Sequence, residues 1–130
     1  MSAAFPVARP RRLRRTPALR ALVAETSLRP EDLVLPVFIK EGISEPQPIG
    51  SMPGVVQHTR DSLRKAAAEA ASAGVGGVMV FGVPAAKDGR GSAADDPAGI
   101  SQLALADLRA ELGEDCVIMA DQCLLSLIHI

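Results

Sequence analysis

From Glu31 onward, short apolar runs alternate with segments whose apolar residues recur at helical spacing. The runs are Leu33–Ile39, Gly77–Val83 and Cys116–Ala120. Because nearly every position in them is apolar, they predict strands that are buried on both faces. Pro36 weakens this prediction for the first run, since proline cannot donate a hydrogen bond to a sheet.

The segments between these strands predict two helices. The first covers Thr59–Ala73, stops at Gly74, and has an apolar stripe of Leu63, Ala66, Ala67 and Ala70. The second follows a polar loop, 84–96, with Asp96 expected as its cap and Pro97 as its first residue. Its buried stripe comprises Ile100, Leu103, Ala104, Leu108 and Leu112, and Gly113 ends it. The stretch between the first strand and the first helix, with a turn at Ser51–Gly54, predicts a loop.

Buried strands that alternate with helices predict a parallel sheet with right-handed crossovers. Such a sheet belongs either to a doubly wound fold or to an eightfold barrel, and no G-x-G-x-x-G motif follows the first strand. In both folds the functional residues lie at the carboxyl ends of the strands. Here those ends are Phe38–Glu41, Phe81–Val83 and Asp121–Leu124.

The first 24 residues differ in charge from the rest of the chain. They hold six arginines and no acidic residue, whereas the remainder holds eight basic against fifteen acidic residues. Pro6, Pro10 and Pro17 divide this arm into pieces too short for stable helices. We interpret residues 1–30 as an arm that contacts another subunit, in preference to a nucleic-acid patch or an organelle presequence.

Composition excludes several classes of protein. The net charge of −1 and the 2% of aromatic residues argue against a protein that binds nucleic acid or an acidic membrane surface. No run approaches eighteen apolar residues, so no membrane-spanning helix is expected. Two cysteines without a signal peptide favour a reducing, cytoplasmic location.

Few residues carry candidate chemistry. At the third strand end, Asp121 could transfer protons and the thiolate of Cys123 could bind a metal, although a small buried hydrophobe is the commoner role of a lone cysteine. We interpret Cys116 as a packing residue and His58 as an exposed residue before a helix. Lys40 could act as a nucleophile if desolvated, but a solvated surface lysine is the favoured interpretation. Lys87–Ser92 resembles a phosphate loop in composition and not in spacing.

Several segments together resemble one family. They are Arg9–Arg14, Val23–Thr26, Asp32–Phe38, Pro48–Gly54, Val80–Pro84, Lys87–Asp88, Gly91–Ser92 and Asp121–Leu124, in this order. They closely resemble the amino-terminal portion of the porphobilinogen synthase, or delta-aminolevulinic acid dehydratase, family. The resemblance implies an α/β fold in which residues 31–124 form the first three β/α units of a (β/α)8 TIM barrel. This barrel is incomplete. The resemblance also implies that the preceding arm wraps a neighbouring subunit in an octamer.

The resemblance also implies an activity. The family condenses two molecules of 5-aminolevulinate into porphobilinogen, a precursor of haem, on two Schiff-base lysines. Cys123 matches the first ligand of the family's zinc cluster, and Asp121 matches an active-site aspartate; dependence on magnesium in place of zinc stays open. Lys40, Lys65 and Lys87 match neither Schiff-base lysine, so this chain is expected to be an inactive fragment. The alternative is a non-catalytic α/β module whose basic arm binds a partner or nucleic acid.

The end of the chain departs from the family after Leu124. Residues Leu125–Ile130 are a translation of CTG TCT CTT ATA CAC ATC, a transposon end used as an adapter in sequencing libraries. We therefore interpret 125–130 as a non-native tail, in which His129 is no ligand. Gln122 stands where the family usually has an apolar residue.

An incomplete barrel has consequences for stability. The first and third strands are expected to have unpaired edges, and Val37, Val80 and Ile118 are expected on the barrel's interior face, without opposing strands. The isolated chain is therefore expected to be aggregation-prone or molten.

Overall fold

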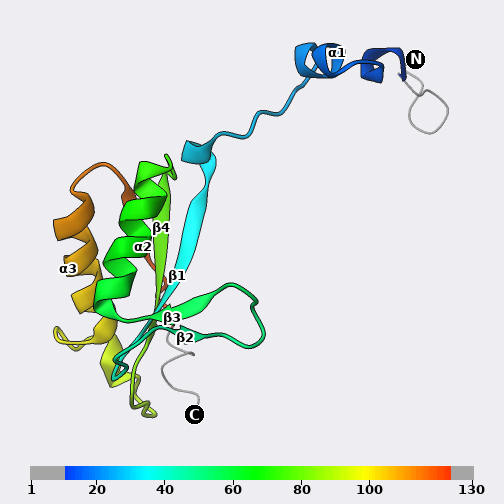
Figure 1. Cartoon of the computed structure of the whole chain (residues 1–130). Helices are drawn as coiled ribbons and strands as arrows, with labels where there is room; N and C mark the ends of the chain where they lie inside the picture. The colour runs from blue at the N-terminus through cyan, green and yellow to red at the C-terminus, as the bar shows by residue number, and fades with distance from the viewer. Residues whose placement is uncertain (1–10, 124–130) are drawn as a thin grey trace.

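The structure is a computed structural model, and it describes residues 11–123. Two parallel strands of seven residues form the centre of its sheet, β1 (Val34–Lys40) and β4 (Gly77–Val83), and the shorter β5 (Val117–Ala120) runs parallel to β4 at the edge. Helix α2 (Arg60–Ser72) connects β1 to β4, and α3 (Ile100–Leu112) connects β4 to β5. Figure 1 shows both helices side by side on one face of the sheet. The predicted order of strands and helices is confirmed.

Two short strands within the predicted loop are a correction to the sequence analysis. Strands β2 (Gln47–Pro48) and β3 (Val56–His58) form an antiparallel pair, and the sheet order is β2-β3-β1-β4-β5. Strand β3 runs parallel to β1 and pairs with it at Phe38 and Ile39. Segments of two or three residues are too short to show periodicity in sequence, so only their pairing identifies them. The edge of β1 is therefore covered near its carboxyl end, contrary to expectation.

Pro36 lies within β1 without disturbing its pairing to β4. The amide of Gly77 donates to Leu33 O, and the amide of Glu41 donates to Val83 O. Hydrogen-bonding groups alternate between the two edges of a strand, so the odd-numbered positions face β4. The nitrogen of Pro36 therefore faces the other edge, where β3 does not extend.

The helix ends follow local capping chemistry. Thr59 caps α2, with its hydroxyl accepting from the Ser62 amide. Helix α3 begins at Ile100 with Gly99 as its cap, so the predictions of Asp96 as the cap and Pro97 as the first helical residue were wrong. Asp96 instead accepts from the Ala98 amide and closes a turn ahead of the helix. Gly113 ends α3 as predicted, with a φ of 55° that favours glycine.

The core lies between the helices and one face of the sheet. Val37 and Val80 belong to it and are 3% and 1% exposed. Ile118 packs against the same core and pairs with the buried Val78. The expectation that Val37, Val80 and Ile118 face the barrel interior was therefore wrong. The uninterrupted apolar runs gave no alternation from which to tell the two faces apart. The complete core cluster is Val37, Ile39, Leu63, Ala67, Val78, Val80, Ile100, Ala104, Leu108, Leu112 and Cys116, with Ile118 packed against it.

The arm extends away from the sheet (Figure 1). It contains the 3-10 helix η1 (Arg11–Arg14) and the short α1 (Pro17–Leu22), which has no buried residue. Helix α1 begins where Thr16 caps it and Pro17 takes its first position. Among residues 11–123, no helix has both the length and the apolar character needed to cross a membrane.

Candidate functional site

The carboxyl ends of β1, β4 and β5 meet at one edge of the sheet. Phe38 pairs with Phe81, and one position earlier Val80 pairs with Ala120. The Asp121 amide donates to Val80 O over 3.0 Å, which continues the pairing beyond β5. Since Val37 and Val80 face the helices, Phe38, Phe81 and Asp121 project from the opposite face. The three residues therefore form one row across the carboxyl end of the sheet.

An aromatic pair forms the centre of this row. The rings of Phe38 and Phe81 stack with their centroids 5.2 Å apart and their planes at 27°. They line a cavity of about 410 Å³ together with Asp121 and Cys123, and Ser101 of α3 lies on its wall. The structure thus brings together Asp121 and Cys123, the two predicted site residues, and both are exposed.

The metal-binding potential of this cavity follows from its donor set. Asp121 offers carboxylate oxygens and Cys123 a sulfur, and zinc sites in proteins use three or four such ligands. No group of three or more such residues able to hold a metal occurs within 11–123. The described residues therefore do not make a complete metal site.

The wall formed by α3 packs tightly against β4. A Cβ placed on Gly82 would lie 1.9 Å from Ser101 Oγ, and one placed on Gly99 would lie 2.8 Å from Ala93 O. Gln102 Nε2 donates to Ala94 O over 2.7 Å, while its Oε1 is buried with no hydrogen-bond partner among the described residues. Sequence reasoning missed Ser101 and Gln102. The signal for them was their place in the first turn of a helix that follows a strand's carboxyl end.

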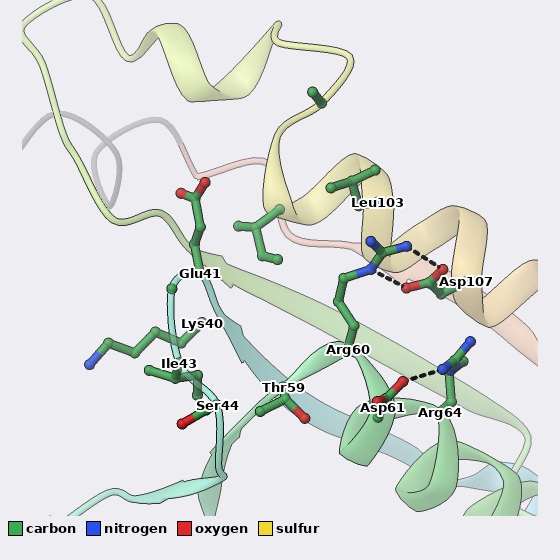
Figure 2. A pocket seen from close by; sticks show the side chains of 13 residues that line it. Lys40, Glu41, Ile43, Ser44, Thr59, Arg60, Asp61, Arg64, Leu103 and Asp107 are labelled. Carbon is green, nitrogen blue, oxygen red and sulfur yellow. Dashed lines mark hydrogen bonds and ion pairs between the residues drawn. The ribbon is translucent and has the colours of Figure 1, made fainter.

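A second cavity, of about 620 Å³, lies between the end of β1 and the first turns of α2 and α3 (Figure 2). Inside it, Arg60 Nε and Nη2 donate to the Asp107 carboxylate over 2.6 and 2.7 Å. These hydrogen bonds hold the pKa of Asp107 below its ordinary value and raise that of Arg60. Arg64 pairs with Asp61. Both guanidinium groups are therefore occupied by acidic side chains of this chain.

Lys40 is fixed at the same sheet edge. Its Nζ donates to Gln47 Oε1 over 2.9 Å, and the residue is half-buried. Lys40 is one of the residues that line the second cavity, and Figure 2 shows its side chain pointing away from Arg60.

His58 corrects a sequence-based prediction, because it is half-buried and not exposed. It is the last residue of β3, and its Nδ1 lies 3.0 Å from Ser62 Oγ. Burial lowers the pKa of His58. The position between a short strand and a helix looked solvent-exposed in sequence because β3 itself was not predicted.

For Cys116 and for the loop at 87–92, the structure agrees with the interpretations that assign them no chemistry. Cys116 is 4% exposed within the core cluster, as expected of a packing residue. In the loop at 87–92, the Asp88 carboxylate accepts from the amides of Arg90 and Ser92 and from the Ser92 hydroxyl. These contacts, led by the Ser92 hydroxyl, lower the pKa of Asp88. The loop's amides thus bind its own carboxylate, and its geometry is not that of a phosphate cradle.

Comparisons with known proteins identify the family. The model of the family described as Delta-aminolevulinic acid dehydratase matches residues 7–128. Relatives with that name from Streptomyces coelicolor and Mycobacterium tuberculosis are 62% and 65% identical over 122 residues, which is 92% of this chain and 37% of each relative. The chain thus spans little more than a third of the curated relatives it matches.

A solved structure agrees with this assignment. It is the delta-aminolevulinic acid dehydratase of Toxoplasma gondii in complex with the reaction product porphobilinogen, which superposes with a TM-score of 0.81 at 29% identity. The superposition covers 94% of this chain and 35% of that structure, so the parallel sheet described above is part of a TIM barrel, as predicted. This chain belongs to the delta-aminolevulinic acid dehydratase family.

Proposed function

We propose that this chain is the amino-terminal part of an enzyme that condenses two molecules of 5-aminolevulinate into porphobilinogen. The observation that carries the proposal is the cavity at the carboxyl end of the sheet, where Asp121 and Cys123 lie beside the Phe38–Phe81 pair. In a TIM barrel this end is the catalytic end. Family membership disfavours the alternative of a non-catalytic module with a basic arm.

Asp121 and the aromatic pair have distinct roles in this proposal. The exposed Asp121 carboxylate accepts and returns protons during the condensation, which is general acid–base chemistry. The stacked rings of Phe38 and Phe81 provide an apolar floor that excludes water from the reacting atoms. Replacing Asp121 by Asn in the full-length enzyme removes the proton acceptor at nearly constant shape. We expect a loss of product formation of about 10²-fold or more, measured by porphobilinogen colorimetry.

Cys123 contributes one metal ligand in this proposal. The family is metal-dependent in general. A thiolate favours zinc, whereas magnesium prefers oxygen ligands, so zinc is proposed over magnesium. The remaining ligands must come from outside residues 11–123. A Cys123→Ser variant of the full-length protein is expected to bind less zinc by atomic emission, with Cys116→Ser as the matched control. Equal zinc content in both variants would contradict this role.

The 130-residue chain alone is proposed to be inactive. Its three lysines are Lys40, Lys65 and Lys87, and none matches a Schiff-base lysine of the family. No porphobilinogen is expected from the purified chain at any zinc or magnesium concentration. Product formation that survives repurification of the chain would overturn this.

The parts of the chain have proposed roles of their own. We propose residues 1–30 as an arm for a neighbouring subunit in a homo-octamer and 31–124 as the partial barrel. Apolar side chains exposed on the arm support this: Leu22 is 81% and Leu28 is 76% exposed. Deleting 1–30 from the full-length protein is expected to reduce the assembly's mass by light scattering. A thiolate ligand at an exposed strand end requires a reducing compartment, so the cytoplasm is the proposed location.

The proposed adapter tail, Leu125–Ile130, lies outside the described residues. Resequencing of the source locus tests it. We expect the native gene to encode other residues than Leu125–Ile130 after Leu124. A genomic stop codon directly after the codon for Ile130 would refute the adapter hypothesis.

A further inference from the structure

The loop between β4 and α3 supplies one wall of the cavity of about 410 Å³ at the proposed site. The loop contains the 3-10 helix η3 (Ser92–Ala94), and Ala93 and Ala94 of this turn line the cavity together with Asp121. None of the three residues of η3 is buried, so packing alone holds the turn weakly. The position of this wall therefore depends on the hydrogen bonds that hold its backbone.

A side chain of α3 holds the end of the turn. Gln102, the third residue of the helix, donates from Nε2 to the Ala94 carbonyl oxygen over 2.7 Å. The last carbonyl groups of a helix have no partner within it, and here Gln102 supplies one. Gly99 leaves room for this contact, because a Cβ on Gly99 would lie 2.7 Å from Gln102 Oε1. The wall is thus tied to the first turn of α3.

The stability of the fold does not explain why this side chain is an amide. Its Oε1 is buried and accepts no hydrogen bond from residues 11–123. A buried acceptor without a donor destabilises a fold, and methionine, of similar length and without N–H or C=O groups, would avoid that cost. The hydrogen bond to Ala94 is therefore offset by the unsatisfied oxygen. What the amide adds is one defined position of η3 against α3.

We propose that Gln102 is a positioning residue of the site, which holds the η3 turn in place as a wall of the cavity before the substrate binds. This inference rests on the proposed function and adds a residue to it. Gln102 acts through the backbone of Ala94 and needs no contact with the reacting atoms. A wall that is ordered in the free enzyme spares the substrate the cost of ordering it on binding.

Loss of this hydrogen bond changes substrate binding and not the chemical step. When η3 becomes ordered only on binding, the ordering cost falls equally on the bound substrate and on the transition state. KM for 5-aminolevulinate then rises while kcat stays nearly unchanged. A residue that only stabilises the fold gives the opposite pattern, because its loss lowers the amount of active enzyme and hence the apparent kcat at unchanged KM.

Two variants of the full-length enzyme remove the hydrogen bond in different ways. Gln102→Met keeps the length without the donor, and Gln102→Asn keeps the amide but is one methylene too short to reach Ala94 O. We expect each to raise KM about threefold to tenfold, as for the loss of one hydrogen bond, with kcat within about twofold. Gln57→Met is the matched control at a half-buried glutamine of β3 outside the cavity lining, and it should change neither constant.

Hydrogen exchange measures the wall directly and without turnover. The Ala94 amide donates to Gly91 O over 2.9 Å within the turn, so its exchange reports whether η3 is formed. In the free full-length enzyme, Gln102→Met is expected to speed exchange at Ala94 about threefold to tenfold, and Gln57→Met should not. Saturating porphobilinogen, used as the probe ligand, should bring the exchange of the two variants back together.

The outcomes distinguish this inference from the proposed function. If the unmodified full-length protein forms no porphobilinogen, the proposed function fails. If it forms porphobilinogen and both Gln102 variants keep the KM and the exchange rate of the Gln57→Met control, only the role of Gln102 is overturned. A lower kcat at unchanged KM also overturns it, because that pattern belongs to fold stability. If Gln102→Met does not fold, by far-ultraviolet dichroism, Gln102→Asn decides in the same way.

Discussion

At the residue scale, the pair between Arg60 and Asp107 joins α2 to α3 through two parallel hydrogen bonds. Asp107 is only 13% exposed, whereas Arg60 is 48% exposed, so solvent screens the pair in part. A double-mutant cycle of Arg60→Ala and Asp107→Ala is expected to give a coupling of about 1 kcal/mol in the free energy of unfolding. The Arg90–Asp95 pair, exposed on both sides, is the control and should show no measurable coupling.

The same coupling should depend on pH in a defined direction. The folded-state pKa of Asp107 is lowered, so the unfolded state binds more protons near the carboxylate's ordinary pKa. The stabilisation is therefore complete above about pH 4 and is lost as pH falls through the folded-state pKa. Repeating the cycle at pH 7 and at about pH 3 checks this; a larger coupling in acid would contradict it.

Gly76 is a second residue whose role is visible only in three dimensions. A Cβ there would lie 2.1 Å from Glu31 O, a backbone atom that cannot move without shifting the chain. We expect Gly76→Ala to cost about 1–3 kcal/mol in urea unfolding followed by far-ultraviolet dichroism. Gly50→Ala, with nothing within 4 Å of the new Cβ, should change the free energy by less than about 0.5 kcal/mol.

Site residues could be predicted from sequence where they follow directly from a strand end. Asp121 and Cys123 come immediately after an apolar run, and that position made them candidates for chemistry at a strand end; the structure adds that both line one cavity. Ser101 and Gln102 reach the same cavity through helix packing, which depends on the crossover geometry between β4 and α3. The Lys40–Gln47 bond was equally hidden, because it depends on the unpredicted hairpin of β2 and β3.

At the scale of elements, strand identity could be predicted and strand orientation could not. The runs that predicted β1 and β4 are apolar at both odd and even positions, so sequence did not reveal which face the helices cover. The helices resolve this, since Leu63 and Leu108 pack with Val37 and Val80 in one cluster. Apolar runs alone therefore predict the strands of the sheet, but they do not predict which of its two faces the helices cover.

Two valines of β1 test the face assignment with one type of substitution. Val37 is 3% exposed beneath the helices, whereas Val34 is 47% exposed on the opposite face. Val37→Ala is expected to destabilise the chain by about 1.5–3 kcal/mol, and Val34→Ala by less than about 0.5 kcal/mol. Urea unfolding at low protein concentration measures both. Equal costs would mean that the helices do not cover the Val37 face.

At the scale of the whole molecule, one face of the sheet is covered by helices, and no helix within residues 11–123 covers the other (Figure 1). Apolar side chains remain on the second face, with Val117 59% exposed and the Phe38–Phe81 pair partly exposed. We expect the purified chain to self-associate as concentration rises, and sedimentation velocity measures this. The double variant Val34→Thr and Val117→Thr keeps side-chain shape while adding hydroxyl groups, and it should shift association to higher concentration. A monodisperse monomer at all concentrations, with one cooperative unfolding transition, would contradict the expectation.

This two-faced sheet has a consequence for synthesis on the ribosome. The helix-facing core is complete within residues 11–123, so it can form before any later segment has been translated. In relatives of which 122 residues are 37%, about 200 residues follow the corresponding segment, and at about 5–20 residues per second their translation takes about 10–40 s. Throughout that interval the nascent chain presents the apolar row of Phe38 and Phe81 to the surrounding solvent. Chaperone demand in this family should therefore peak after the third β/α unit has emerged, well before the barrel can close.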